Sequence, residues 1–134
     1  MTKIFQTMEF DAAHRLLGYN GTCNLVHGHT WRCDVVFESS RDTDEVGILV
    51  DYRLLKQYIK DNYDHRLLLN ESDPLVPIML EQNMIVTKFS GNPTAENICK
   101  KVLRDLCQVV CLRVSDKLTV RIYESKDNYA EESY

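Results

Sequence analysis

The residue types best suited to chemistry gather in one short stretch, CNLVHGHTW, which runs from Cys23 to Trp31 and holds two of the four histidines. His27 and His29 are two positions apart, and at the head of a strand side chains with this spacing project from the same face. Gly28 between them lets the backbone bend close to a bound group. Two imidazoles on one strand face predict a metal site.

A third imidazole comes from His14, which shares strand parity with the residues before it if the first strand extends that far. Three neutral nitrogens and one open coordination position are typical of catalytic zinc, whereas structural zinc has four protein ligands. The sequence therefore predicts a zinc ion held by His14, His27 and His29. Each histidine taken alone has a simpler interpretation, as a surface residue or as a core residue with satisfied hydrogen bonds.

Cys23 has several possible roles. As a fourth ligand it would close the metal site, and as a free thiol beside an open metal it would be a catalyst. A nearby cation favours the thiolate form, and the preceding loop, GYNGT, favours exposure of the side chain. The residues alone leave an inert thiol, a ligand and a nucleophile or base as open alternatives.

Two further polar positions stand out. His65 directly follows Asp64 just beyond a predicted helix, where it either contacts that carboxylate or complements the helix dipole. Glu124 continues the inward parity of the apolar residues before it in KLTVRIYE. A carboxylate at that position either lies in solvent at the open end of the strand or accepts paired N–H donors from a ligand, and spacing alone favours solvent.

Hydrophobic periodicity predicts the elements that position these groups. Alternation or short apolar runs predict strands over 3–10, 29–38, 46–50, 84–89 and 117–124. Apolar residues at helical spacing predict one helix after Asp51, and a second whose N-cap is Asn92 or Thr94. A loop containing Pro74 and Pro77 separates them. The order does not alternate strand and helix, so we expect an α+β fold without a parallel doubly wound sheet.

The bulk properties limit the class of protein. A length of 134 residues without repeats or linkers predicts a single domain over 1–134. The net charge of −4 lacks the basic balance of a nucleic-acid binder, and no apolar run approaches the roughly 20 residues of a membrane span. The N-terminus alternates, unlike a signal peptide. Five cysteines suit a reducing compartment, so we expect a cytoplasmic protein with neither nucleic-acid nor membrane partners.

The segments FDAAHRL, CNLVHGHTW, GILVDYRLLK, YDHRLLLNE, NPTAENICKKV and VRIYES occur in the order seen in the 6-pyruvoyltetrahydropterin synthase family. The resemblance extends from Phe10 to about Ser125, and Cys-x-x-x-His-Gly-His is its most specific part. The three-residue gap between Cys23 and His27 resembles the bacterial 6-carboxytetrahydropterin synthase branch, of queuosine biosynthesis. The pyruvoyl-forming animal enzymes typically have a longer gap.

This resemblance implies a fold and an assembly. The family has the tunnelling fold, in which each subunit carries a four-stranded antiparallel sheet with two helices on one face. Trimers close their sheets into a barrel, and two trimers stack into a homohexamer with active sites between subunits.

The resemblance also implies a role for each polar position. The zinc ligands would be the three histidines already named. Cys23 would be the catalytic base, Asp64 and His65 an acid–base pair, Glu124 the residue that binds the pterin, and Thr94 a further pterin contact.

The implied substrate is a pterin triphosphate, 7,8-dihydroneopterin triphosphate. The carboxytetrahydropterin branch forms 6-carboxytetrahydropterin and releases acetaldehyde and triphosphate. One alternative keeps the two carbons and forms the pyruvoyl product. Another is a non-catalytic zinc- or pterin-binding module in which Cys23 closes the metal site. The candidates for holding the triphosphate are Lys3, Arg15, Arg32 and Arg113.

Overall fold

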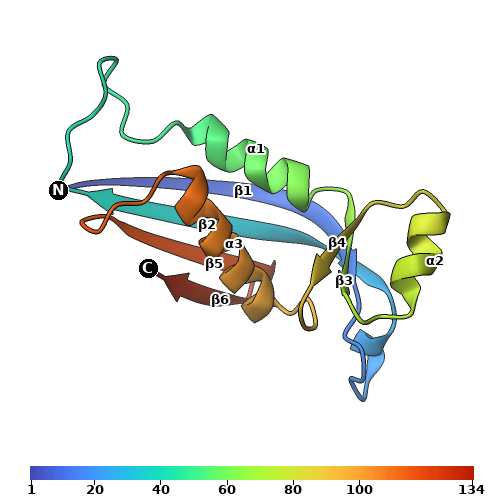
Figure 1. The fold of residues 1–134 in the computed structure, drawn as a ribbon. Coiled ribbons are helices and arrows are strands. Elements are labelled where there is room, and N and C mark those ends of the chain that lie inside the picture. Colours follow the sequence, from blue (N-terminus) through green and yellow to red (C-terminus); the bar gives the residue numbers. More distant parts are fainter.

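The computed structural model describes residues 1–134, with two long helices packed on one face of a six-stranded sheet (Figure 1). The strand order is β4-β3-β1-β2-β5-β6. The strands are β1 Thr2–His14, β2 His27–Ser39, β3 Arg66–Asn70, β4 Val86–Phe89, β5 Lys117–Ser125 and β6 Asn128–Ser133. The helices are α1 Tyr52–Asn62, α2 Leu75–Glu81 and α3 Ala95–Val109, with a short 3-10 turn, η1, at Thr22–Asn24. None of these helices is long and apolar enough to cross a membrane.

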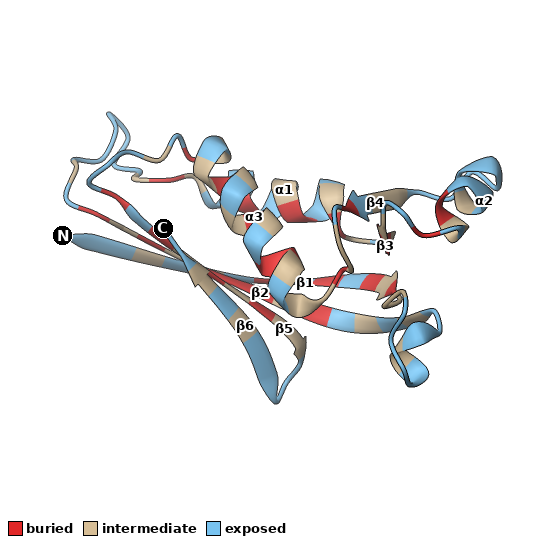
Figure 2. Cartoon of the chain, turned by 60° about the horizontal axis from the view of Figure 1, so that its bottom comes forward, coloured by how far each residue is buried: buried red, intermediate tan, exposed pale blue.

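The longest ladder joins β1 and β2, which pair antiparallel from Thr2 opposite Ser39 to His14 opposite His27. More buried and less buried residues alternate along both strands, except at the buried Asp34 of β2 (Figure 2). The buried parity faces α1 and α3, and the rings of Phe10 and Trp31 stack there with centroids 6.0 Å apart. The alternation read from the sequence therefore identifies the core-facing side of this ladder.

Both long helices begin at the caps that the sequence suggests. The Asp51 carboxylate accepts a hydrogen bond from the backbone N–H of Arg53 at 2.9 Å, and α1 follows. Thr94, rather than Asn92, is the N-cap of α3, and its hydroxyl oxygen accepts the N–H of Asn97 at 3.2 Å. Apolar residues at helical spacing on both helices are buried against the sheet. Local capping and periodicity are sufficient to predict these two elements.

The expectation of a four-stranded antiparallel sheet with two helices is wrong. β3 pairs parallel with β1 and with β4, and β6 adds a sixth strand beside β5. A short strand buried on both faces is a continuous apolar run without alternation, so RLLLN carries no strand signal of its own. The third helix, α2, lies in the expected proline loop, because proline is tolerated in the first turn of a helix.

The strand expected over 46–50 is also absent. The Asp44 carboxylate accepts the backbone N–H groups of Val46 and Ile48 at 3.0 and 2.8 Å. The backbone N–H of Asp44 in turn donates to the carbonyl of Ile48 at 2.9 Å. Asp side chains compete in this way with regular ladders, so the apolar run VGILV forms a closed loop.

Candidate metal centre

Three imidazoles meet at the end of the β1–β2 ladder. The register places His14 opposite His27 and Ala12 opposite His29, so all three histidines share the helix-covered face. One ring nitrogen from each lies within 4.8 Å of the others, and the Nε2 atoms of His14 and His27 are 3.1 Å apart. The structure thus brings together the three residues that strand parity selected.

In two of the rings, the hydrogen bond made by Nδ1 fixes the tautomer. Nε2 is then the acceptor that faces the cluster. Nδ1 of His14 lies 2.8 Å from the Pro93 carbonyl oxygen, and Nδ1 of His27 lies 2.7 Å from that of Leu25. A carbonyl only accepts, so each Nδ1 carries the proton and each Nε2 keeps its lone pair. Two lone pairs 3.1 Å apart repel one another, and a shared cation converts that repulsion into two ligand bonds.

In the third ring, that of His29, Nε2 also lacks a hydrogen-bond donor. Nε2 of His29 is buried and makes no hydrogen bond. The nearest carboxylate oxygen, Oε1 of Glu124, is 3.6 Å away, which exceeds hydrogen-bond length. Buried polar atoms are nearly always satisfied, so this orphaned nitrogen points to a bound group.

The donor set fits zinc. Two nitrogens on one tetrahedral zinc ion lie about 3.3 Å apart when each bond is about 2.05 Å long, close to the 3.1 Å between His14 and His27. Burial lowers the pKa of both His14 and His29, which keeps their imidazoles in the neutral form that binds metals. Imidazole nitrogens also suit zinc among the divalent metals.

Packing holds the rings in place. Trp31 is fully buried beneath the cluster, with its ring centroid 4.9 Å from that of His14 and 5.3 Å from that of His29. Its indole N–H donates to the carbonyl of Ala12 at 3.1 Å. The hydrogen bonds fix the tautomers, and this packing fixes the ring orientations.

A cavity of about 560 Å³ is lined by Glu124 and Thr94 but by none of the three histidines. The side chain of Glu124 is 34% exposed and faces His29. Spacing alone favours solvent for this carboxylate, and the structure leaves it partly exposed, beside a cavity whose wall includes residues of β6. Other residues that line the cavity are Leu16, Ala95, Glu96, Asn128, Tyr129, Ala130, Glu131 and Glu132.

The contribution of the C-terminal tail to this cavity is missing from the sequence prediction. β6 folds back on β5 through Lys126 and Asp127, and it supplies Asn128 and Tyr129 to the cavity wall. A polar turn followed by the alternating NYAEES is a hairpin signal. The sequence contains this hairpin signal. It is weak, because Ala130 is the single apolar residue of the segment that faces inward.

Cys23 lies on η1, and its backbone carbonyl accepts the N–H of Leu16 at 2.8 Å. Its thiol is free and half-buried. The sulfur is not one of the donor atoms that lie within 4.8 Å of one another. Cys23 is therefore close to His27 in sequence, but its sulfur does not belong to the candidate ligand group. That group consists of the three histidines.

Asp64 and His65 do contact each other, although neighbouring side chains usually diverge. Oδ2 of Asp64 is 3.0 Å from Nδ1 of His65, and a positive φ of 56° at His65 accompanies the contact. Oδ1 of Asp64 accepts the N–H of Asp11 at 3.0 Å, and this hydrogen bond is the main cause of the lowered pKa of Asp64. The imidazole of His65 is 80% exposed and does not line the cavity beside Glu124.

None of the four triphosphate candidates lies free at this cavity. Lys3 pairs with Glu38, and Arg32 pairs with Asp34 on the outer face of the sheet. Arg15 donates two hydrogen bonds to the buried carboxylate of Asp73, at 2.7 and 2.5 Å. The cavity itself is acidic, with no lysine or arginine among its lining residues.

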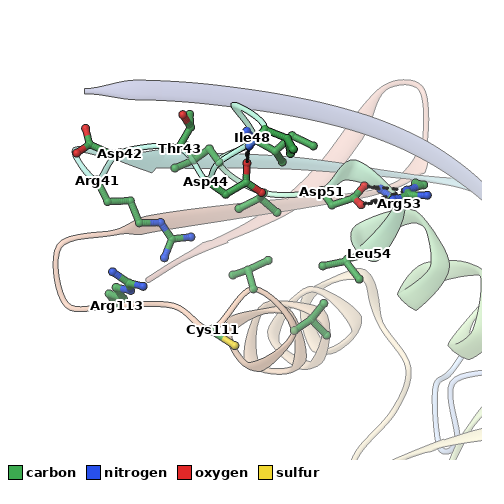
Figure 3. Close-up of a pocket in the computed structure, with 15 residues that line it drawn as sticks. Arg41, Asp42, Thr43, Asp44, Ile48, Asp51, Arg53, Leu54, Cys111 and Arg113 are labelled. Atoms are coloured by element: carbon green, nitrogen blue, oxygen red, sulfur yellow. Dashed lines mark hydrogen bonds and ion pairs between the residues drawn. The ribbon is translucent and has the colours of Figure 1, made fainter.

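The fourth candidate, Arg113, lines a different cavity, of about 720 Å³, at the opposite end of the sheet (Figure 3). Arg41 and Asp44 also border it, beyond the Ser39 end of β2. The β1–β2 ladder is 13 residues long, which corresponds to about 40 Å. This larger cavity is therefore separate from the imidazole cluster.

Comparisons with known proteins show what this chain is similar to. The family model described as 6-pyruvoyl tetrahydropterin synthase matches residues 3–133. The 6-carboxy-5,6,7,8-tetrahydropterin synthase of Rickettsia bellii is 35% identical over 104 residues, which cover 73% of this chain and 75% of the relative. The Haemophilus influenzae protein of the same name is 30% identical over 145 residues, with 98% of each chain covered.

Solved structures share the fold. The crystal structure of 6-pyruvoyl tetrahydropterin synthase from Plasmodium vivax matches with a TM-score of 0.68, covering 100% of this chain and 99% of that chain. The sequence identity is 16%, so this likeness concerns the fold alone.

Proposed function

The chain belongs to the 6-pyruvoyl tetrahydropterin synthase family, and on that premise we propose that it is a zinc-dependent 6-carboxy-5,6,7,8-tetrahydropterin synthase of queuosine biosynthesis. Its substrates are 7,8-dihydroneopterin triphosphate and one water molecule, and its products are 6-carboxytetrahydropterin, acetaldehyde and triphosphate. The names of the Rickettsia and Haemophilus relatives support this product. The observation that carries the proposal is the convergence of three imidazole nitrogens near the carboxylate of Glu124, which lines a cavity.

Glu124 binds the pterin ring in this proposal. A pterin presents an N–H and an amino group side by side, and one carboxylate accepts both in a bidentate, charge-assisted contact. Thr94 lines the same cavity, and its oxygen accepts from Asn97 N, which leaves its own O–H free to donate to a ligand. The cavity volume of about 560 Å³ lies within the range of small-molecule sites.

The chain's own residues move the protons. Cys23, as a thiolate, removes the proton from the side-chain carbon of the substrate. Asp64 holds Nδ1 of His65, so Nε2 is the nitrogen that carries protons to and from the substrate. A bound zinc ion supplies Lewis-acid stabilisation of the negative charge that develops on the side-chain oxygens.

The proposed assembly is a homohexamer built from two trimers, with active sites between subunits. Two features of the single chain support it. The acidic cavity offers no cation for a triphosphate, and His65 is 80% exposed and does not line the cavity with Glu124. A neighbouring subunit that supplies a cation for the triphosphate and a His65 side chain would complete the site. We also propose a cytoplasmic location, which the five free cysteines support.

Incubation of the zinc-loaded protein with 7,8-dihydroneopterin triphosphate tests the proposed reaction. We expect acetaldehyde and a carboxypterin in equal amounts. A pyruvoyl product without acetaldehyde would instead support a 6-pyruvoyltetrahydropterin synthase. No turnover at full zinc occupancy would exclude both enzymes and leave a zinc- or pterin-binding module.

Glu124→Gln tests the pterin contact. The substitution keeps the shape of the side chain and removes its charge, so we expect KM to rise about 30-fold, because hydrogen bonds to charged groups contribute about 2 kcal/mol. Zinc content should not change. Glu96→Gln is the matched control, since Glu96 lines the same cavity from the exposed first turn of α3. An unchanged KM in Glu124→Gln would refute the assigned role.

A further inference from the structure

One carboxamide, that of Asn92, joins the segment after His14 to the loop before α3. Oδ1 of Asn92 accepts the backbone N–H of Leu17 at 3.0 Å, and Nδ2 donates to the Leu17 carbonyl at 2.9 Å. This two-bond bridge resembles the pairing of two strands, with a side chain in place of one backbone. It connects residues 75 apart in sequence.

Asn92 is itself held from several directions. Oδ1 also accepts from Nδ2 of Asn70 at 3.3 Å. The backbone carbonyl of Asn92 accepts from Thr94 N at 2.9 Å and from Nδ2 of Asn97 at 2.8 Å. The residue therefore belongs to a hydrogen-bonded junction between the end of β3 and the start of α3, and its carboxamide has a fixed orientation.

The bridge places the acceptor of a candidate metal ligand. Pro93 follows Asn92 directly, and its carbonyl is the acceptor for Nδ1–H of His14 at 2.8 Å. Leu17 lies three residues after His14. The Asn92–Leu17 bridge and the Pro93–His14 hydrogen bond thus close one small ring of chain, and each contact constrains the other. The bonds from Thr94 N and Asn97 Nδ2 hold the Asn92 backbone on the α3 side, and the Asn92–Leu17 bridge ties it to the segment after His14.

We infer that Asn92 is a positioning residue for the metal centre. It acts through Pro93, whose carbonyl fixes the tautomer and orientation of His14 and so directs Nε2 at the ion. This inference rests on the zinc-dependent function proposed above. Outer-shell partners of histidine ligands typically change metal affinity by about 10- to 100-fold, so loss of the bridge should weaken zinc binding by that factor.

Asn92→Ala tests the inference, with zinc alone as the probe. We expect the zinc affinity of the metal-free full-length protein, measured by chelator competition, to fall about 10- to 100-fold. The visible absorption of the cobalt-substituted protein should also change, since it reports ligand geometry. The matched control is Asn62→Ala, which removes a bond from Nδ2 to the Tyr58 carbonyl at 2.8 Å near the end of α1. That variant should keep the wild-type affinity and spectrum.

Asn92→Asp is the second variant and guards against loss of fold. It keeps the shape and the acceptor for Leu17 N, and it replaces the donated bond with a carboxylate oxygen that repels the Leu17 carbonyl, so its zinc affinity should also fall. Wild-type zinc affinity and cobalt spectrum in a folded Asn92 variant would overturn the inference, and so would equal losses in Asn62→Ala. Failure of the wild-type protein to bind zinc at all would instead count against the proposed function.

Discussion

His27→Ala is expected to remove stoichiometric zinc and to lower kcat at least about 1,000-fold. The substitution takes away one of three nitrogens that face a common point. His27 is half-exposed, in contrast to the buried His14, so its truncation leaves no large hole in the core. Lewis-acid stabilisation is worth several kcal/mol, and every 1.4 kcal/mol is about a factor of ten in rate.

His65→Ala provides the matched control for metal content. Its imidazole lies outside the ligand group and is exposed, so this variant should bind zinc as the wild type does. Zinc per chain, measured after dialysis by elemental analysis, distinguishes the two variants. Equimolar zinc of wild-type affinity in His27→Ala would show that the imidazole cluster is not the metal site.

Cys23→Ala is expected to lower kcat by about 100- to 10,000-fold, the usual contribution of a general acid or base. Zinc content should stay unchanged, because the Cys23 sulfur is not part of the group formed by the three imidazoles. The measurement combines acetaldehyde release under saturating substrate with zinc per chain on the same sample. The separation of these two readouts is what distinguishes a base beside the metal from a fourth ligand.

Cys111→Ala is a suitable companion variant. Cys111 is exposed and lines the cavity at the far end of the sheet, so its loss should affect neither zinc content nor turnover. If Cys23→Ala loses zinc together with activity, then the cysteine is a ligand, the metal site is closed, and the catalytic role assigned to it is wrong.

Local sequence signals predict much of the fold. Alternation identifies β1, β2 and β5, and the carboxylate of Asp51 and the hydroxyl of Thr94 mark the starts of α1 and α3. These signals succeed because strand parity and helix capping depend on residues only a few positions apart. They fail for β3, whose apolar run has no period, and for residues 46–50, where the Asp44 carboxylate bonds the backbone instead.

Prediction of the site divides in the same way. The spacing of His27 and His29 and the parity of His14 are sufficient to select three imidazoles for one face. Spacing could not decide the position of Glu124, because part of the cavity wall beside it comes from β6, the other arm of the β5–β6 hairpin. Spacing does not select the triphosphate ligands, and of the candidates Arg15 is bound to Asp73 while Arg113 lies at the opposite end of the sheet.

The sequence by itself determined which side chains form the candidate metal centre, since their strand periodicity is a property of the local chain. Only the tertiary structure decided how they are held. The acceptor for His14 is the carbonyl of Pro93, 79 residues away, and that carbonyl is placed by the bridge between Asn92 and Leu17. Hydrogen bonds to backbone atoms depend little on the identity of the accepting residue, so such contacts leave no pattern in the sequence and arise only when distant segments pack together.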